Sequence, residues 1–328
     1  MQEVAQKTMN QEPLVTVITV FLNAERFIEE AISSVFAQDY RNWELVLVDD
    51  GSTDGSTEIA LRYARRYSSR VRYMEHTGHK NRGISASQNL AVSAAKGEFI
   101  AFLDSDDVWL REKLEQQVAV LLSQPEAMMV YGKTQYWYSW NTNALDEKPD
   151  LILEPGVEPN SLLRPPTLFV RLLREEIPIP CPSDVMIRRI AASDCGAFEE
   201  SFRCIFTDQV LYAKLSLKWP VIVSDQNWFK YRKHSDSAVA TVKKNGEMRS
   251  ARLLYLKWLS NYVADQGITD TRVRRAIANA KLRARFPGLL RLRPHIKYRA
   301  LLIKEYMRAS ARRILPGTLY RLLRTSGH

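Results

Sequence analysis

Apolar and polar positions change in regular blocks along the first 125 residues of the chain. Four short apolar runs, rich in β-branched residues, have the length of buried strands; they span residues 14–22, 44–48, 71–75 and 98–103. Four amphipathic stretches follow them and have the spacing of helices that bury one face; they span residues 25–38, 54–67, 84–95 and 110–122. Strands that alternate with helices predict an α/β fold, with a mostly parallel sheet covered by helices on both faces.

The second half of the chain is less regular. Eight of the 14 prolines lie between residues 149 and 182, which predicts a long ordered loop with little regular structure. Strand-like runs at 185–187 and 221–224 lie on either side of a helix-like stretch at 208–217. From residue 248 onward the pattern is helical, with breaks at prolines.

Length and composition exclude several classes of protein. A chain of 328 residues, 45% hydrophobic and 26% charged, is long enough to bury a sizeable core and too apolar for extended disorder. The three cysteines form no C-x-x-C pair, so we expect free thiols and neither a disulfide framework nor a structural zinc site. The N-terminus is polar and no run approaches the ~18 apolar residues of a membrane span, so we expect a cytoplasmic protein.

Charge divides the chain into two parts. Residues 245–328 contain 19 basic and 4 acidic residues and carry a net charge of +15, whereas residues 1–244 contain 28 basic and 33 acidic residues and carry −5. The stretch 295–324 interleaves leucines with arginines and lysines, which is typical of a helix that lies on an anionic membrane. We therefore expect a peripheral position on the inner face of the cell membrane. The alternatives are helices packed on the protein body and, with no recognised motif to support it, a nucleic-acid partner, which we do not expect.

Acidic residues follow two strands of the predicted sheet. Asp49 and Asp50 end the second strand, and Asp104, Asp106 and Asp107 come directly after the fourth. Ligands of such sheets bind beyond the carboxyl ends of the strands, so these carboxylates are expected to share a site. Carboxylate oxygens suit Mg²⁺ or Mn²⁺, and a cation there would offset the negative charge of a nucleoside diphosphate. The alternative is that one or two of these acids only cap the next helix.

Two other nucleotide sites are excluded. A dinucleotide-binding fold needs G-x-G-x-x-G after its first strand, and residues 21–24 contain no glycine. Residues 132–134 imitate the end of a phosphate-binding P-loop, but Ala127 stands where the motif needs its first glycine.

Three segments, in this order and spacing, resemble the nucleotide-binding half of a family 2 glycosyltransferase with the GT-A fold: VTVITVFLN, ELVLVDDGSTDGS and NRGISASQNLAVSAAKGEFIAFLDSDD. The resemblance covers residues 13–132 and continues more weakly, through FTDQVLYAKL and YRKHSDS, to about residue 240. It implies a Rossmann-like GT-A domain at 13–240, divided into a nucleotide-binding half at 13–132 and an acceptor half at 133–240. A flexible N-terminus at 1–12 and a basic helical extension at 241–328 would complete the chain.

The resemblance also implies roles for single residues. By the family's pattern Asp50 contacts the base of the nucleotide, Asp104 faces the ribose or the metal, and Asp106 binds the metal. Asp208, in the later acidic motif, is the catalytic base. The residues expected to bind the nucleotide are Val20, Leu22, Asn23, Asp50, Lys80, Arg82, Asp104 and Ser105.

Further candidates lie in the second half. His234 is expected to join Asp104 and Asp106 at the Mn²⁺ or Mg²⁺ ion. The residues expected to face the acceptor are Trp137, Ser183, Asp184 and Arg232, and Arg232 is also a candidate contact of the diphosphate. The plainer alternatives are surface loop positions for Arg232 and His234, solvated cations for Lys80 and Arg82, and an aromatic core or interface position for Trp137.

Three positions depart from the family's pattern. Leu22 stands where an aromatic residue often stacks on the base, Gln88 where an arginine is common, and Thr207 where a glutamate usually precedes the catalytic aspartate. The first two concern the identity of the base and the contacts to phosphate, and they leave the predicted fold unaffected.

The resemblance implies an inverting, metal-dependent transferase that works by a single in-line displacement. We expect a nucleotide-sugar donor, specifically a UDP-sugar, and a hydroxyl acceptor on a glycan or lipid-linked glycan in cell-surface polysaccharide biosynthesis. One alternative is a polyprenyl-phosphate glycosyltransferase, whose phosphate acceptor needs no general base. The other is a non-catalytic protein that binds nucleotide sugars or serves as a scaffold.

Overall fold

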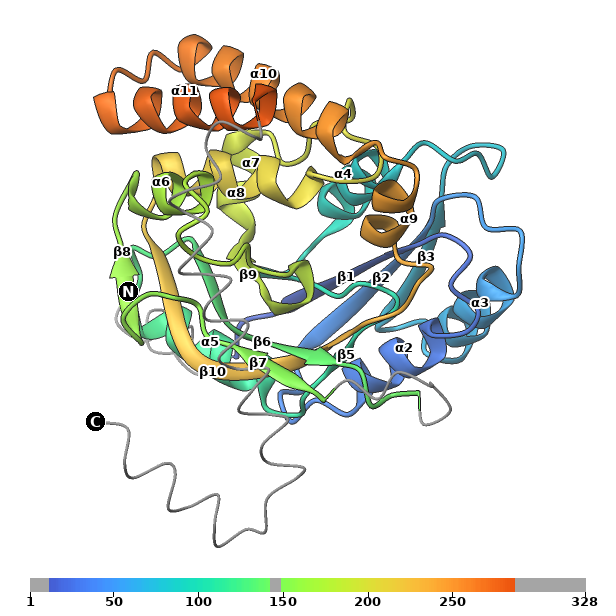
Figure 1. Ribbon diagram of the computed structural model, residues 1–328. Coiled ribbons are helices and arrows are strands. Elements are labelled where there is room, and N and C mark those ends of the chain that lie inside the picture. The colour runs from blue at the N-terminus through green and yellow to red at the C-terminus, as the bar shows by residue number, and fades with distance from the viewer. Residues whose placement is uncertain (1–11, 142–148, 287–328) are drawn as a thin grey trace, which may run out of the picture.

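The computed structural model describes residues 12–141 and 149–286, and these ranges contain one ten-stranded sheet with helices on both faces (Figure 1). Most of the N-terminus expected to be flexible and the basic stretch 295–324 lie outside the described residues. The strands are β1 (Val15–Phe21), β2 (Trp43–Asp49), β3 (Val71–Glu75), β4 (Phe99–Phe102), β5 (Val108–Trp109), β6 (Met129–Trp137), β7 (Leu151–Leu153), β8 (Ser161–Leu163), β9 (Met186–Arg188) and β10 (Val221–Arg232). The helices are α2 (Ile28–Phe36), α3 (Ser56–Arg66), α4 (Ile84–Ala94), α5 (Lys113–Ser123), α6 (Thr167–Leu173), α7 (Arg189–Cys195), α8 (Thr207–Lys218), α9 (Ala238–Lys244), α10 (Met248–Asp265) and α11 (Thr271–Arg285), with a 3₁₀ turn, η1, at Pro182–Asp184.

The sheet combines parallel and antiparallel pairs. Its order is β3-β2-β1-β4-β9-β6-β10-β5, with β7 beside β6 and β8 beside β10. The strands β3, β2, β1 and β4 pair in parallel, as do β6 and β10. Strand β9 runs antiparallel to both β4 and β6 and so joins the two parallel groups. The α/β class is confirmed, and parallel pairing dominates in the nucleotide-binding half.

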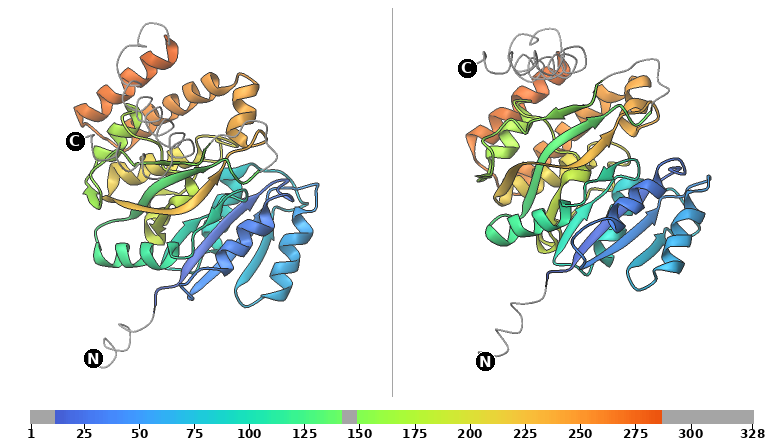
Figure 2. Two further views of the ribbon diagram at one scale, coloured as in Figure 1. Left: turned by 60° about the horizontal axis from the view of Figure 1, so that its bottom comes forward. Right: turned by 90° about the horizontal axis from the view of Figure 1, so that it is seen from below.

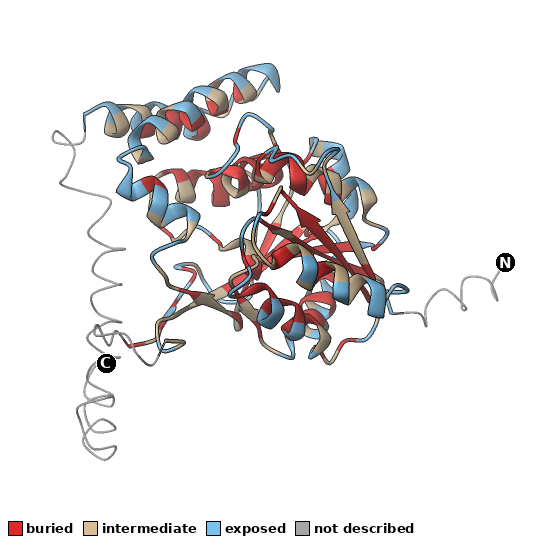
Figure 3. Cartoon of the chain, turned by 90° about the vertical axis from the view of Figure 1, so that its right-hand side faces the viewer, coloured by how far each residue is buried: buried red, intermediate tan, exposed pale blue. Residues whose placement is uncertain are grey.

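Alternation along the strands distributes the core over two faces. On β2, Leu45 and Leu47 face the cluster formed with α2, α3 and α5, whereas Val46 and Val48 face the cluster formed with α4, α7 and α8. Because both faces are covered, the central strands are apolar at successive positions. Figure 3 shows the sheet and the inner faces of the helices as buried, and the outer faces of the helices as exposed.

The helices α10 and α11 form a further layer beyond the sheet. Leu256 and Leu259 of α10 and Val273 and Ile277 of α11 share a buried cluster with side chains of α6 and α8. Figures 1 and 2 show this layer beyond α6 and α8, away from α2 and α3. The described part of the basic extension thus packs on the protein body through α10 and α11. The choice between membrane contact and packing concerned residues 295–324, which lie outside the described residues, and it stays a prediction. No helix among the described residues is long and apolar enough to cross a membrane.

Two regions differ from the sequence prediction. The proline-rich stretch 149–182 contains β7, β8 and α6 as well as loop. Strand β10 continues to Arg232, eight residues beyond the predicted end at 224, although its register against β6 shifts around Asn227. The polar residues of β10 lie where its register is irregular, so a prediction from the apolar run alone ended the strand too early. The division of the chain at residues 240 and 241 stays a prediction.

Candidate active site

The acidic loop, residues 104–107, is held at both of its ends. It begins one residue after β4, where the Leu103 N–H donates to the Ile18 carbonyl of β1 at 2.9 Å. It ends at β5, which pairs antiparallel with β10 through Trp109 and Phe229. Within the loop the Asp107 N–H donates to the Asp104 carbonyl at 3.1 Å. The carboxylates therefore project from a tight turn fixed to the sheet on both sides.

Asp107 is the fully buried member of the loop. Its Oδ2 accepts from the Ser183 hydroxyl at 2.6 Å, and its Oδ1 accepts from the backbone N–H of Arg232 at 2.9 Å. Ser183 Oγ also accepts from the backbone N–H of Asp104 at 3.0 Å. Burial, and then the charges of Asp106 and Asp104, raise the pKa of Asp107 well above its usual value. Asp107 thus links the loop to β10 and to η1.

Asp106 is paired with His234. Its Oδ2 lies 2.9 Å from His234 Nε2, and the His234 side chain is 7% exposed. The other ring nitrogen, Nδ1, is buried and has no hydrogen-bond partner among the described residues. The Phe27 ring packs against the imidazole, with 4.8 Å between the centroids. The structure therefore brings together the predicted metal ligands Asp106 and His234, which are 128 residues apart in the sequence.

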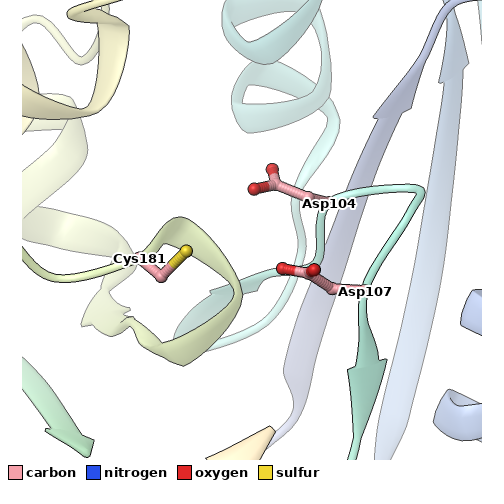
Figure 4. A group of neighbouring side chains, drawn as sticks. All are labelled: Asp104, Asp107 and Cys181. Atoms are coloured by element: carbon pink, nitrogen blue, oxygen red, sulfur yellow. The ribbon is translucent and has the colours of Figure 1, made fainter. Parts of the chain in front are cut away.

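Asp104 lies in a second group of possible ligands. Its carboxylate, that of Asp107 and the Cys181 thiol have ligand atoms within 4.8 Å of one another. Figure 4 shows Asp104 and Asp107 projecting from the loop toward Cys181 on the facing segment. Burial, followed by the charges of Asp106 and Asp208, raises the pKa of Asp104 to about 8. Like charges this close favour a bound cation, and the hard oxygen donors of the loop fit Mg²⁺ or Mn²⁺.

Asp208 lies in the first turn of α8. Protein surrounds the carboxylate densely, and this burial raises its pKa from 3.8 to about 6, against the opposing effect of hydrogen bonds from the backbone N–H groups of Gln209 and Asp208. Its charge acts on Asp104, so the two carboxylates lie within electrostatic reach. Phe206, the residue before α8, has a positive φ of 66°, which turns the chain into the helix. This is the environment of a carboxylate tuned toward neutral pH.

Asp50 holds a loop. Its carboxylate accepts from the backbone N–H groups of Arg82 and Gly83 at 2.8 and 3.0 Å, and from the Ser87 hydroxyl at 3.0 Å. The carboxylate is therefore fixed against the start of α4. The Arg82 side chain itself is exposed, as is that of Lys80. A contact between Asp50 and a nucleotide base stays a prediction.

The remaining predicted donor residues lie around the end of β1. Asn23 has φ 52° and joins β1 to the turn after β2, because its N–H donates to Ser52 Oγ at 3.0 Å and its Oδ1 accepts from the Thr53 N–H at 2.7 Å. Leu22 is 46% exposed. Val20 is partly buried against the α4 side of the sheet, and Ser105 lies half-buried within the acidic loop.

The predicted acceptor residues are occupied by internal contacts. Trp137 packs against the guanidinium of Arg232, with 4.4 Å from Cζ to the ring centroid. Arg232 itself is 4% exposed. Ser183 and Asp184 are fully buried, and Asp184 Oδ2 accepts from the Gly132 N–H at 2.6 Å. Ser183, Asp184 and Arg232 thus support the site from within, and their burial gives an acceptor no direct access, whereas Trp137 is half-buried.

A buried lysine lies beneath η1. Lys113 Nζ donates to the Asp184 carbonyl at 2.9 Å and to Gln117 Oε1 at 2.7 Å. Burial lowers the pKa of Lys113 to about 7, although the charge of Asp184 acts in the opposite direction. Sequence analysis did not single out Lys113, because a lysine in an amphipathic helix usually faces solvent.

A small recess lies between α6, α8 and α10. Gln209 and Tyr212 line it, and its charged lining residue, Arg252, is paired with Glu175 at 2.6 Å. The acidic loop does not contribute to its lining, so the recess is not where a metal-bound donor would lie.

Sequence reasoning missed three contributors to the site. Cys181 approaches the acidic loop from a segment 74 residues later, Glu30 on α2 contacts Arg232, and Arg203 contacts the loop that holds Asp50. Arg203 donates to the carbonyl and to Oδ1 of Asn81 at 3.2 and 2.9 Å. No local pattern marks such residues, because their importance comes from contacts between distant parts of the chain.

Comparison with known protein families gives a direct match. The family model described as Glycosyl transferase family 2 matches residues 16–196, more than half of the chain. The UDP-Glc:alpha-D-GlcNAc-diphosphoundecaprenol beta-1,3-glucosyltransferase WfgD of Escherichia coli is 40% identical over 119 residues, which cover 36% of this chain and 45% of that protein. The glycosyltransferase alr2836 of Nostoc sp. (strain PCC 7120) is 31% identical over 197 residues, 57% of this chain and 59% of that protein. The chain thus matches less than two thirds of the length of either relative.

Solved structures share the fold. S. aureus TarS 1-349 in complex with UDP-GlcNAc has a TM-score of 0.56 and 20% identity, with 91% of each chain covered. The mannosyltransferase PcManGT from Pyrobaculum calidifontis, in complex with GDP-Man and Mn²⁺, has a TM-score of 0.56 and 20% identity, with 96% of this chain and 80% of that chain covered. These likenesses concern the fold, and they confirm the expected GT-A architecture.

Proposed function

Since the chain belongs to glycosyl transferase family 2, we propose that it is an inverting enzyme that transfers a sugar from a nucleotide-sugar donor to an acceptor hydroxyl. The observation that carries this proposal is the position of Asp208. A carboxylate whose pKa is raised to about 6 lies within electrostatic reach of the acidic loop, at the carboxyl end of the sheet where donors bind in such folds. Asp208 is thus suited to take a proton, and the acidic loop is suited to hold a charged donor.

The donor would bind with its diphosphate toward Asp106 and His234. The proposed ligands of Mn²⁺ or Mg²⁺ are Asp106 and His234, whose Oδ2 and Nε2 lie 2.9 Å apart, together with Asp104 from its group with Asp107 and Cys181. When bound, a divalent cation supplies positive charge that stabilises the departing nucleoside diphosphate. The solved neighbour PcManGT was obtained in complex with GDP-Man and Mn²⁺, which supports a divalent cation for this chain.

Asp208 would act on the acceptor. The acceptor oxygen attacks the anomeric carbon of the donor sugar, the bond from this carbon to the diphosphate oxygen breaks, and Asp208 takes the hydroxyl proton. A pKa near 6 leaves Asp208 mostly ionised at neutral pH while keeping it more basic than a solvated aspartate. A single displacement of this kind inverts the configuration at the anomeric carbon.

A UDP-sugar is the proposed donor, and a glycan or lipid-linked glycan of the cell surface is the proposed acceptor. The name of the Escherichia coli relative specifies UDP-Glc and a diphosphoundecaprenol-linked sugar, and TarS was solved with UDP-GlcNAc. These names support UDP and a lipid-linked acceptor for this chain. GDP-Man in PcManGT makes GDP-sugars the donors to compare.

The test is a panel of UDP- and GDP-sugars with and without Mn²⁺, read by thermal stability and by release of nucleoside diphosphate. A ligand that binds the folded state raises its melting temperature, so the true donor should give the largest Mn²⁺-dependent shift. Binding without turnover, with any acceptor supplied, would favour the alternative of a non-catalytic nucleotide-sugar-binding or scaffold protein. Transfer to a polyprenyl phosphate, independent of Asp208, would favour the other alternative.

We further propose that the basic extension brings the enzyme to an anionic membrane surface. Residues 245–328 carry +15, and among their arginines and lysines Leu254 of α10, Leu282 of α11 and Phe286, directly after α11, are exposed. Basic side chains beside exposed apolar ones suit the headgroup region of an anionic bilayer, where a lipid-linked acceptor would be presented.

A further inference from the structure

The guanidinium of Arg232 is buried beside the acidic loop. Arg232 is the last residue of β10, and 4% of its side chain is exposed. Its Nε donates to the backbone carbonyl of Asp106 at 2.7 Å, and its backbone N–H donates to Asp107 Oδ1 at 2.9 Å. Its Nη2 lies 2.5 Å from Glu30 Oε2 on α2. One residue thus ties the acidic loop to both β10 and α2.

Three aromatic rings surround this guanidinium. Its Cζ lies 4.4 Å from the Trp137 ring centroid, 4.8 Å from that of Phe27 and 5.2 Å from that of Trp140. The rings exclude water, which strengthens the hydrogen bonds that the guanidinium makes. Two donors of the side chain, Nε and Nη2, are thereby engaged by Asp106 and Glu30.

Both halves of the Asp106–His234 pair depend on this arrangement. Arg232 fixes the backbone of Asp106 on one side, and His234 follows Arg232 by two residues on the other. Phe27 packs against both the imidazole of His234 and the guanidinium of Arg232. A shift of Arg232 would therefore move the carboxylate and the imidazole relative to each other.

We propose that Arg232 is a positioning residue that sets the distance and orientation between Asp106 and His234 for a divalent cation, with Glu30 as its anchor on α2. The proposal rests on the proposed function only in that this pair binds the cation. Arginine suits the task because its planar fork reaches the Asp106 carbonyl and Glu30 at once, whereas lysine offers a single point charge.

The test measures Mn²⁺ affinity directly, from the loss of the electron paramagnetic resonance signal of free Mn²⁺, with the metal alone and with UDP. Arg232→Lys should weaken Mn²⁺ binding about tenfold, within the range observed when residues that orient metal ligands are replaced. Glu30→Gln should weaken it less, about threefold on the same grounds, because the neutral amide still contacts the guanidinium. The affinity for UDP without metal should stay unchanged in both variants.

Glu29→Gln is the matched control. Glu29 precedes Glu30 on α2, is similarly exposed (57% against 52%), and also pairs with an arginine, Arg62, at 2.6 Å, but on α3 and away from the acidic loop. The Glu29→Gln variant should bind Mn²⁺ with the affinity of the wild type.

The outcomes separate this inference from the proposed function. Wild-type protein that binds no Mn²⁺ with UDP would contradict the metal site itself. The positioning role is wrong if the wild type binds Mn²⁺ and both variants, Glu30→Gln and Arg232→Lys, bind it with the same affinity as the wild type. If Arg232→Lys lost affinity for UDP without metal to the same extent as it lost affinity for Mn²⁺, Arg232 would be a general structural residue. This result would also overturn the inference. Should Arg232→Lys fail to fold by circular dichroism, the comparison of Glu30→Gln with Glu29→Gln decides.

Discussion

Asp107 is a fully buried carboxylate and Asp208 a half-buried one, and their contacts suit them to different tasks. Asp107 accepts hydrogen bonds from the Ser183 hydroxyl and the Arg232 N–H, so both of its oxygens hold the acidic loop in place. Asp208 is contacted by backbone N–H groups at the start of α8 and keeps a pKa near 6. The first is built as a support, whereas the second has the basicity that proton transfer near neutral pH requires.

Replacement of the proposed base should strongly lower turnover and leave donor binding intact. We expect Asp208→Asn to lower kcat by about 10²–10⁴-fold, the usual contribution of a general base. Binding of UDP with Mn²⁺, measured by calorimetry, should change little. Full turnover in Asp208→Asn would contradict the hydroxyl-acceptor mechanism and would favour a phosphate acceptor.

The raised pKa of Asp208 predicts how activity depends on pH. Protonated Asp208 cannot accept the hydroxyl proton, so kcat should fall as the pH drops below about 6, where its folded-state pKa lies. The measurement is a kcat profile between pH 5 and 8 at saturating Mn²⁺ and donor. A flat profile across this range would show that Asp208 does not titrate in the rate-determining step.

The same shift makes a prediction for stability. Because the folded pKa lies above the unfolded value of 3.8, the folded state binds more protons between pH 3.8 and about 6. The contribution of Asp208 to the free energy of unfolding therefore falls as the pH rises through this window and stays low above it. Asp208→Asn removes this effect, so urea unfolding should show the variant gaining stability relative to the wild type between pH 4.5 and 7.5. An identical difference at both pH values would contradict the shift.

At the scale of elements, the loop before α4 joins the donor side of the site to the segment before α8. Asp50 holds the N–H groups of Arg82 and Gly83, and the Arg203 carbonyl accepts from the Ile84 N–H at 3.0 Å. Gly83 has φ 91° and ψ 156°, a conformation that is almost confined to glycine. A Cβ added there would also lie 2.9 Å from Arg203 Cβ.

Gly83→Ala should therefore lower the free energy of unfolding by about 2–4 kcal/mol, from backbone strain together with overpacking. It should also weaken UDP binding, because it displaces the N–H groups that hold Asp50. Gly246→Ala is the control: its φ is 73° but open space surrounds it, so we expect a loss of about 1 kcal/mol and unchanged UDP affinity. Denaturant unfolding and UDP titration check both variants, and equal effects at the two positions would argue against the contact with Arg203.

At the scale of the whole molecule, charge and burial differ between the part that carries the candidate site and the basic extension. The acidic loop, Asp50 and Asp208 lie upstream of residue 240, whereas α10 and α11 pack on α6 and α8 and leave their basic outer faces exposed. Packing on the body and contact with a membrane are therefore compatible, since they use opposite faces of the same helices.

Full-length protein should co-sediment with anionic vesicles at low salt and should be released at high salt, because the ionic attraction is screened. Neutral vesicles should bind it weakly. Truncation after Phe286 removes a sequence rich in arginine and lysine but keeps α11, so its binding should fall while its turnover of a water-soluble acceptor is retained. If the full-length protein does not bind anionic vesicles at low salt, the extension serves packing alone.

The sequence by itself determined the fold class and the place of the site. Strands buried on both faces must be apolar at successive positions, and carboxylates directly after such strands lie at one edge of a sheet, so Asp50, Asp104 and Asp106 could be located from local pattern alone. The same reasoning placed Asp208 at the start of a helix, as observed. It ended β10 too early, because the polar residues at its irregular register interrupt the apolar run.

Only the tertiary structure decided which of these residues hold the site and which remain available to a ligand. Ser183, Asp184 and Arg232 were expected to face an acceptor, and each is buried in contacts with the acidic loop or the sheet. The partners of these contacts lie far apart in sequence, up to the 202 residues between Arg232 and Glu30. Local periodicity reports which face of an element is buried, but it carries no information on what that face meets. The distinction between a support and a ligand therefore arises only when the chain has folded.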